Sequence, residues 1–394
     1  MVNIKVVIGS SYGDEGKGLM TDYFCHQAYL QNQSCLNILT NGGAQRGHTV
    51  VHDNHRHVFH HFGSGTFSHA DTYIAQTFIL NPMVFAEEYE DLVKNHNITP
   101  GKDFKVYVHG KCMVTTPYDM MYNKILLVNS GKHNSCGMGI WETMQRYKVR
   151  CQSFEQMCCL TNDTNGIYKY LKLIRNYYLH KMVENHINAS EKWLDLFMSE
   201  GLLEHYVKDF NLLKSIVLDH NDVSWETYNT YVCENAQGLL LDKDVDKING
   251  TPTTTGVGIL RDVALINTMP IMNIEHNAEI CYVTRSYLTR HGDGNIENEC
   301  SRESISNKIN DNTNIPNNCQ GTLRYGVLDL SSLHTRVFND FRKCTLNNAK
   351  LSYAVTHTDE ALFNVSNISP DMAQCVKYIS SSPDTLNVQD MQTS

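Results

Sequence analysis

Short apolar runs alternate along the chain with Gly-rich or polar segments, and this alternation predicts an α/β fold. The runs cover residues 5–8, 35–39, 231–233, 278–283 and 351–355. Their length is typical of buried strands, and a segment of mixed apolar and polar positions at helical spacing follows the first of them at residues 19–30. In such folds ligands bind where the strands end, so we expect the functional residues in the loops that follow the runs.

Apolar positions recur at helical spacing through residues 165–217, which predicts a helical subdomain. Residues 303–322 are polar and Asn-rich, and we interpret them as a mobile loop. No internal repeat divides the chain, and its length fits either one large domain with subdomains or two to three domains.

Composition narrows the class of protein. With 41% hydrophobic and 19% charged residues, the chain is neither disordered nor a coiled coil. A formal net charge of −9 gives no support for a nucleic-acid-binding surface. No run approaches the ~18 apolar residues of a membrane span, and the first residues do not resemble a secretory signal. Thirteen cysteines without a C-x-x-C pair indicate reduced thiols, and a cytoplasmic protein is expected.

The loop after the first run, residues 9–18, has the composition of a phosphate-binding loop. Its glycines at 13, 16 and 18 permit close backbone approach, Lys17 supplies a cation, and the helix start offers free N–H groups. The P-loop pattern is not met, because it requires Gly at position 11 and Ser or Thr at position 18. Asp14 and Glu15 would repel phosphates unless a metal intervenes or one of them handles a proton. The alternative interpretation is a Gly-rich turn with a surface lysine.

Residues 40–49, after the second run, place Arg46 and His48 among glycines. His48 could donate to a developing negative charge or carry a proton, although a single histidine is as often structural. Five further histidines follow at positions 52, 55, 57, 60 and 61. Their irregular spacing on an expected hairpin argues against a metal cluster within this run.

Residues 234–242 and 250–256 follow the third run. Their Thr hydroxyls and the Gln237 amide could bind the phosphate and base of a nucleotide. A common turn rich in Thr, Gly and Pro explains the same pattern.

Taken together and in this order, these segments resemble the adenylosuccinate synthetase family. Residues 12–18 (YGDEGKG) stand for the family's W-G-D-E-G-K-G, and residues 42–49 (GGAQRGHT) for its G-G-x-N-A-G-H-T. Residues 235–242 (NAQGLLLD) are similar to G-A-Q-G-x-L-L-D. Weaker matches lie at residues 60–65, 289–294, 356–359 and 379–384. The matches extend over nearly the whole chain. The resemblance therefore implies that residues 1–394 form a single domain with a large, mainly parallel central sheet flanked by helices, and that the helical subdomain lies within it.

The resemblance also implies a ligase that joins a purine nucleotide to L-aspartate through a 6-phosphoryl intermediate. Asp14 would take the purine N1 proton, Lys17 would spread the transferred charge, and His48 would donate to the reacting oxygen. Mg²⁺ is the implied cofactor, held by Asp14 and the Gly47 carbonyl. The implied ATP and phosphate ligands are Gly13, Glu15, Gly16, Lys17, Gly18, His48, Thr49, Asp359, Ser382 and Pro383.

The remaining implied ligands belong to the purine nucleotide and to aspartate. For the nucleotide they are Asp14, Asn41, Gln45, Ser135, Cys136, Arg150, Gln237 and Thr251. For aspartate they are Gln320, Gly321, Thr322 and Arg324. The family is homodimeric with shared sites, so the arginine that binds the nucleotide phosphate, Arg150 or Arg146, is expected to come from a neighbouring subunit.

Departures from the family pattern favour its phage branch, which makes N6-succino-2-amino-2′-deoxyadenylate from dGMP on the way to 2-aminoadenine DNA. The arginine-rich aspartate loop is thinned at residues 320–329, and His357 replaces the lysine expected near the guanine nucleotide. Asp14 instead favours the ordinary adenylosuccinate synthetases, since phage enzymes often lose this aspartate. His357 favours ATP as phosphate donor and Asp359 favours GTP, and we expect ATP.

Two alternatives remain. The first is an ordinary adenylosuccinate synthetase that uses IMP, aspartate and GTP. The second is an inactive nucleotide-binding homologue, since several binding arginines are missing. For a phage-encoded chain, the cytoplasm would be that of the host.

Overall fold

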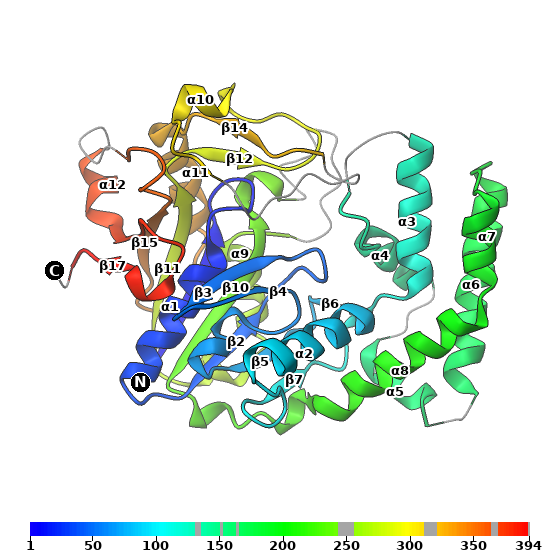
Figure 1. Ribbon diagram of the computed structural model, residues 1–394. Coiled ribbons are helices and arrows are strands. Elements are labelled where there is room, and N and C mark those ends of the chain that lie inside the picture. The colour runs from blue at the N-terminus through cyan, green and yellow to red at the C-terminus, as the bar shows by residue number, and fades with distance from the viewer. Residues whose placement is uncertain are drawn as a thin grey trace.

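The computed structural model describes residues 1–130, 135–149, 153–162, 165–242, 256–310, 321–363 and 369–392. A ten-stranded sheet runs through the molecule (Figure 1). In spatial order its strands are β17 (Gln389–Asp390), β16 (Val376–Ile379), β15 (Lys350–Thr356), β11 (His276–Arg285), β1 (Val2–Gly9), β10 (Thr230–Gly238), β2 (Cys35–Leu39), β5 (Asp71–Ile74), β7 (Val106–Val108) and β9 (Leu218–Asp219). All neighbours are parallel except β16 and β17, so the mainly parallel sheet is confirmed.

The five apolar runs all form strands of this sheet. They become β1, β2, β10, β11 and β15, and β1 lies at the centre between β10 and β11. The interior residues of β1 from Val6 to Gly9 are all buried, as expected of a strand with neighbours on both sides and helices over both faces. Because the strands are parallel, the loops that follow β1, β10, β11 and β15 meet at one edge.

Three small sheets supplement the large one. The hairpin expected among the histidines is formed by β3 (His48–His52) and β4 (His55–Phe59). A second pair comprises β6 (Ile79–Leu80) and β8 (Met113–Val114). The third sheet has the order β12 (Leu288–Arg290), β14 (Arg324–Gly326) and β13 (Glu299–Cys300).

Helices cover the large sheet and extend it on one side. Those associated with the sheet are α1 (Lys17–Leu30), α2 (Pro82–His96), α9 (Ile259–Ile266), α11 (Leu330–Phe341) and α12 (Pro370–Cys375). The short α10 (Arg302–Ile305) contacts β14 of the three-stranded sheet. On the side opposite the C-terminus stand α3 (Pro117–Ser130), α4 (Ile140–Val149), α5 (Phe154–Leu160), α6 (Gly166–Glu184), α7 (Glu191–Met198) and α8 (Glu200–Ile216) (Figure 1).

Residues 165–217 are helical as expected, but the helical part begins earlier, at Pro117. The sequence did not predict α3 and α4, because buried polar residues, among them Asp119 and Arg146, interrupt their apolar periodicity. These helices share a hydrophobic cluster with the sheet, in which Tyr206 and Phe210 of α8 join Ile74 of β5. The helical part is therefore packed continuously onto the sheet.

Part of the Asn-rich segment expected to be a mobile loop is ordered, since residues 302–305 form α10. Residues 311–320 lie outside the described part of the chain. Among the described helices, none combines the length and hydropathy needed to cross a membrane.

Candidate active site

The loop between β1 and α1 is braced by its own acidic residue. Glu15 Oε1 accepts hydrogen bonds from the backbone N–H groups of Ser11 (3.0 Å) and Gly13 (2.8 Å). Glu15 Oε2 lies 3.6 Å from Lys17 Nζ, which also donates to the Gly13 carbonyl. Positive φ angles of 108° at Gly13 and 92° at Gly16 require glycine. The Glu15 carboxylate was expected to bind phosphate. In the structure it bonds to groups of its own loop and stabilises the loop conformation.

Gly18 explains why this loop departs from the P-loop pattern. A Cβ at this position would lie 2.9 Å from the Cβ of His48 and 3.1 Å from the Thr49 carbonyl oxygen. Only glycine allows the first turn of α1 to pack against the start of β3. The loop thereby brings Lys17 and His48 to the same place.

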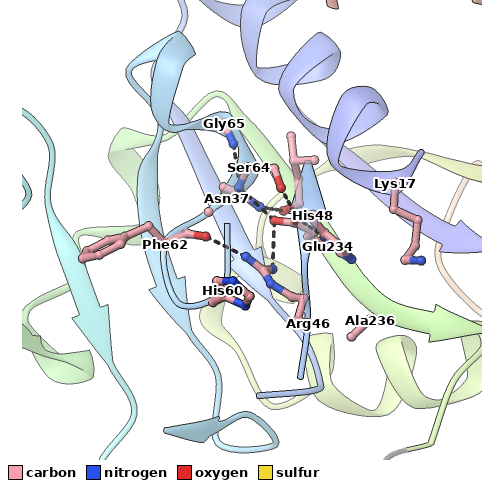
Figure 2. A network of polar contacts seen from close by, with 12 residues as sticks. Lys17, Asn37, Arg46, His48, His60, Phe62, Ser64, Gly65, Glu234 and Ala236 are labelled. Atoms are coloured by element: carbon pink, nitrogen blue, oxygen red, sulfur yellow. Dashed lines mark hydrogen bonds and ion pairs between the residues drawn. The ribbon is translucent and has the colours of Figure 1, made fainter. Parts of the chain in front are cut away.

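His48 belongs to a buried polar network (Figure 2). Its Nδ1 lies 2.5 Å from Oε1 of Glu234, a residue in the middle of β10. The other oxygen, Oε2, accepts from the Ser64 N–H (3.1 Å) and lies 3.2 Å from Arg46 Nη1. Arg46 is fixed in turn because its Nη2 donates to the Phe62 carbonyl at 2.6 Å. A fully buried carboxylate is tolerated here because all its partners are donors.

The charges of this network define the tautomer of His48. Burial would raise the pKa of Glu234, but Arg46 and His48 lower it to about 2, so the carboxylate is ionised and can only accept. Burial lowers the pKa of His48 to about 4 despite Glu234, so the free imidazole is neutral. Nδ1 therefore carries the proton, and Nε2 becomes a donor only when the ring takes up a second proton.

Asp14 is held by a residue from a distant part of the chain. His291 Nε2 lies 2.9 Å from Asp14 Oδ2, and Arg285 Nε donates to the Asp14 carbonyl. Burial would raise the pKa of Asp14, but His291, then Arg285 and Lys17, hold it below its ordinary value. Asp14 is therefore an anion at neutral pH.

One cavity of about 500 Å³ gathers most of the expected catalytic and phosphate ligands. The expected residues that line it are Gly13, Asp14, Gly16, Lys17, Gly18, Gly47, His48, Thr49, Asp359, Ser382 and Pro383. They come from the loops after β1, β2, β15 and β16 and from the first residues of α1 and β3. Gly13 and Pro383, 370 positions apart in sequence, thus line the same cavity at the edge of the sheet where its parallel strands end.

The cavity also has walls that were not among the expected ligands. Arg56, Arg285, Lys308, Asn310 and Glu360 contribute polar groups. Arg285 is the last residue of β11. Because it lies at a strand end and close to the family motif at residues 289–294, the sequence could have indicated it as a site residue.

His357 forms part of the cavity wall at the position of the family's lysine. Its φ is 57°, and its Nδ1 lies 2.8 Å from Thr356 Oγ1. Burial, with a further contribution from Arg285, lowers the pKa of His357 well below the ordinary value. This wall is therefore uncharged where the family pattern has a cation, while the exposed Asp359 two residues on lines the same cavity.

Two glutamines that are not among the residues lining the cavity have buried amide atoms with no hydrogen-bond partner among the described residues. They are both polar atoms of the Gln45 side chain and Oε1 of Gln237. Gln237 also has a positive φ of 67°. Buried polar groups are normally satisfied, so water or a polar ligand would complete the hydrogen bonds of these amides.

Asn41 differs from these glutamines because the main chain saturates its amide. Its Nδ2 donates to the carbonyls of Gly256 (2.7 Å) and Ala236 (3.4 Å), and its Oδ1 accepts from the Ala236 N–H (2.6 Å). Asn41 thus ties the end of β2 to the end of β10. It has no free group for a direct nucleotide contact.

Ser135 and Cys136 lie at the helical side of the site. Ser135 Oγ donates to Asn123 Oδ1 at 2.9 Å, and Cys136 is partly exposed. Arg150 and Thr251 lie outside the described residues.

Arg146 is not the phosphate-binding arginine. It forms two hydrogen bonds with Asp119 (2.8 and 2.9 Å) and further bonds with the Tyr170 hydroxyl (2.9 Å) and the Val114 carbonyl (2.7 Å). The guanidinium is fully buried in its own subunit, so that alternative is wrong. Arg150 remains the candidate for the nucleotide phosphate.

Arg324, expected to hold aspartate, is occupied within the protein. It forms a bidentate pair with Glu299 (2.7 and 2.5 Å) and donates to the carbonyls of Gly292 (3.1 Å) and Gly294 (2.7 Å). To bind a substrate carboxylate it would have to exchange Glu299. Gly321 and the exposed Thr322 lie just before it, and Gln320 lies outside the described residues.

Arg290 of β12 pairs with Arg324 of β14 and is a second cation that was not among the expected ligands. It is buried and packs 5.1 Å from the centre of the Tyr12 ring. Its Nη1 and Nη2 donate to the carbonyls of Asn295 (2.7 Å) and Asp293 (3.0 Å), and its Nε has no partner. Arg290 lies within residues 289–294, which match a family motif, and this match could have indicated it as a site residue. Glu234 and His291 were missed as well, because their contacts with His48 and Asp14 span about 190 and 280 positions.

The residues at the cavity fit a Mg²⁺ ion. The Asp14 carboxylate and the exposed Gly47 both border the cavity, and Asp14 Oδ2 is buried without a well-aligned hydrogen bond. Carboxylate and carbonyl oxygens are the ligands Mg²⁺ prefers, and it usually completes its shell with water and substrate phosphates.

A parallel sheet with a Gly-rich anion loop, a lysine and an acid–base pair at its edge defines an α/β nucleotide-using enzyme. The family model described as adenylosuccinate synthetase matches residues 6–352. The chain therefore belongs to the adenylosuccinate synthetase family. This family comprises C–N ligases that act on aspartate and a purine nucleotide.

Individual relatives agree with this assignment. The chain is 27% identical to adenylosuccinate synthetase of Malacoplasma penetrans over 316 residues, which cover 78% of this chain and 67% of that protein. The chain spans about two thirds of the length of such curated relatives.

Two solved structures share the fold. The fully ligated adenylosuccinate synthetase from Plasmodium falciparum has a TM-score of 0.68 at 15% identity, covering 98% of this chain and 99% of that one. The succinoaminodeoxyadenylate synthetase of cyanophage S-2L, bound to dGMP and dATP, has a TM-score of 0.64 at 14% identity, covering 99% and 95%.

Proposed function

We propose that this chain condenses dGMP with L-aspartate, driven by ATP, to give N6-succino-2-amino-2′-deoxyadenylate. The observation that carries a nucleotide ligase is the cavity that unites Asp14, Lys17 and His48. The amides of Gln45 and Gln237, which have atoms without a partner in the described residues, are the proposed ligands of the base. The choice of dGMP rests on the chain's departures from the family pattern. One fold neighbour with that activity was solved with dGMP and dATP.

The reaction must remove the purine 6-oxygen, a poor leaving group. Asp14, an anion at neutral pH, accepts the N1 proton, which raises electron density on O6. O6 then attacks the γ-phosphorus of ATP, and the bond to the bridging oxygen of ADP breaks. Lys17 stabilises the charge on the transferred phosphoryl group, and bound Mg²⁺ would neutralise phosphate charge there.

His48 contributes through its Nε2. The phosphates of bound nucleotides raise the pKa of the ring, and the ionised Glu234 stabilises the imidazolium on the far side. Nε2 then donates to the oxygen on which charge builds. The amine of aspartate next displaces the 6-phosphate. Its carboxylates require cations, and Arg290, together with Arg324 once Glu299 is displaced, would supply them.

The base of dGMP suits this site. Guanine presents N1–H and the N2 amino group as adjacent donors, and Asp14, with two carboxylate oxygens, can accept from both. IMP lacks the amino group. The uncharged His357 wall favours ATP over GTP as the phosphate donor.

We further propose a homodimer in which Arg150 of one subunit binds the nucleotide phosphate of the other. The enzyme would work in the cytoplasm, that of the host for a phage-encoded chain. In a mixture of two inactive variants, Lys17→Ala and Arg150→Ala, mixed dimers would contain one intact site and regain activity. No recovery after verified subunit exchange would contradict a shared site.

The ordinary adenylosuccinate synthetase reaction with IMP and GTP is the second candidate. It is favoured by Asp359, which lines the cavity and could accept from the donors of a guanine base. An inactive homologue is disfavoured because the three expected catalytic residues lie together.

A phosphate-release assay separates these possibilities. With aspartate and Mg²⁺ present, we expect release that depends on dGMP and ATP, and a loss of about 10²–10⁴-fold in Asp14→Asn. Release with IMP and GTP alone would support the ordinary synthetase. No release with any nucleotide pair would support the inactive homologue, and full activity of Asp14→Asn would overturn its role as proton acceptor.

A further inference from the structure

A second group of titratable side chains lies away from the cavity, where β4 packs beside α2. His57 of β4 and Asp91 and His96 of α2 each present a ligand atom, and these atoms lie within 4.8 Å of one another. His57 Nδ1 is 2.8 Å from Asp91 Oδ2, and His96 Nε2 is 3.9 Å from the same oxygen. None of these residues lines the cavity.

We propose that His57, Asp91 and His96 form a site for a divalent transition-metal ion, with Zn²⁺ as the probe. Two imidazole nitrogens and one carboxylate oxygen are a ligand set that Zn²⁺ accepts with ligand distances near 2 Å. The present separations are close to those between ligands around such an ion, so small rotations bring all three atoms into its shell. Mg²⁺ prefers oxygen ligands and would not compete.

Surrounding groups orient the two histidines as in known metal sites. Glu88 Oε1 lies 3.6 Å from His57 Nε2. This nitrogen is buried and forms no well-aligned hydrogen bond. The Nδ1 of His96 lies 3.2 Å from His55 Nδ1. The nitrogen opposite the metal therefore has a carboxylate nearby in His57 and a hydrogen-bond partner in His96, and such partners orient metal-ligating histidines.

Exposure gives the ion a path to the site. The side chains of His57 and His96 are 6% and 9% exposed, whereas Asp91 is 42% exposed. The carboxylate therefore faces solvent while both rings are shielded. A water molecule from the solvent side would occupy the fourth position of a tetrahedral ion.

The position of the site gives the ion a structural role. It would cross-link β4 to α2, and β4 pairs with β3, where His48 lies opposite Phe59. Glu88 also accepts from the N–H groups of His60 (2.9 Å) and His61 (2.6 Å), the residues that follow β4. A metal at this junction would fix both ends of the hairpin that carries His48.

Metal binding to tag-free, EDTA-stripped protein tests this proposal. We expect one Zn²⁺ per chain by elemental analysis, a higher melting temperature with Zn²⁺, and visible absorption bands typical of tetrahedral Co²⁺ when Co²⁺ replaces it. In His96→Gln and in Asp91→Asn we expect affinity to fall by more than the roughly 10-fold loss typical of removing an outer-shell partner. Asp91 is exposed enough for its variant to fold.

The matched control is His205→Gln. His205 forms a similar His–Asp pair on a helix, with Nε2 3.5 Å from Asp209 Oδ2, but it is not part of a three-ligand group. Its variant should bind Zn²⁺ like wild type. Substoichiometric binding to wild-type protein, or wild-type affinity in both ligand variants, would overturn the proposal. Neither result depends on which nucleotide the enzyme uses.

Discussion

Glu234 determines which nitrogen of His48 faces the cavity. Because this carboxylate is ionised and fully buried, it holds Nδ1–H and leaves Nε2 toward the substrate. It also favours the charged ring that the mechanism needs. In the proposed mechanism Glu234 touches no reacting atom, but it sets the protonation of His48, which does.

Glu234→Gln should lower kcat by about 10²-fold or more, because the imidazolium loses its counter-charge. Since Glu234 raises the pKa of His48, its removal lowers that pKa, and activity that requires the protonated ring is lost at a lower pH. The measurement is kcat against pH. Ser64→Ala is the control, because it removes a hydrogen bond to the same carboxylate and keeps the charge. A basic limb of the pH profile that does not move would contradict this role.

His291 should have the corresponding effect on Asp14. His291→Gln removes the group that most lowers the pKa of Asp14, so this pKa rises. Activity that requires the Asp14 anion would then be lost earlier on acidification, because the acid limb of the pH profile moves to higher pH. The acid limb of kcat/KM reports the shift, and His186→Gln, at an exposed position, is the control. An unchanged acid limb would mean that the contact is displaced before the proton moves.

The sequence identified Asp14, Lys17 and His48 because they lie in short motifs. It could not identify Glu234, His291 or Arg290 as their neighbours, since those contacts depend on how distant strands are ordered in the sheet. The sequence also suggested that Arg146 and Arg324 bind substrate, whereas both form ion pairs within the protein. An arginine's type predicts that it binds an acid, but only the fold shows that the acid is Asp119 or Glu299.

At the scale of elements, the packing of α1 against β3 positions Lys17 relative to His48. Gly18→Ala should lower kcat at least about tenfold, because the added Cβ pushes against His48 and Thr49. Overpacking of this kind costs about 1–3 kcal/mol, which exceeds the ~1 kcal/mol that Ala gains over Gly in a helix.

Gly201→Ala is a matched control at the same position of another helix. Gly201 is the second residue of α8, as Gly18 is of α1, and a Cβ there would meet only Ser199 Oγ at 3.7 Å. Its substitution should stabilise the protein by about 0.5–1 kcal/mol and leave kcat unchanged. Steady-state kinetics and urea unfolding check both variants. Equal effects of the two substitutions would contradict the packing argument.

The elements themselves were largely predictable. Apolar runs predicted β1, β2, β10, β11 and β15, because strands buried on both faces are continuously apolar. The early helices α3 and α4 were not predicted, because a buried Asp119–Arg146 pair replaces apolar residues at the positions that define their periodicity.

At the scale of the whole molecule, buried neutral histidines couple stability to pH. Burial lowers the pKa of His48 to about 4 and that of His61 to about 3. Both would titrate near 6.5 in the unfolded chain, so between pH 6.5 and 4 the unfolded state binds more protons. The free energy of unfolding should therefore decrease on acidification through this window, by up to about 1.4 kcal/mol per pH unit for each histidine.

Urea unfolding at pH 7.5, 6 and 5 measures this dependence. His61→Gln keeps an acceptor for the Asn81 N–H and removes one titrating ring, so its stability should depend less on pH. Stability that is constant from pH 7.5 to 5 would show that these rings are not buried in neutral form.

A substrate matrix tests the choice of dGMP and ATP. Wild-type protein is incubated with aspartate, Mg²⁺, ATP or GTP, and dGMP, GMP or IMP, and the products are identified by mass. We expect N6-succino-2-amino-2′-deoxyadenylate from dGMP with ATP. Turnover of IMP with GTP alone would instead show that the chain is an ordinary adenylosuccinate synthetase.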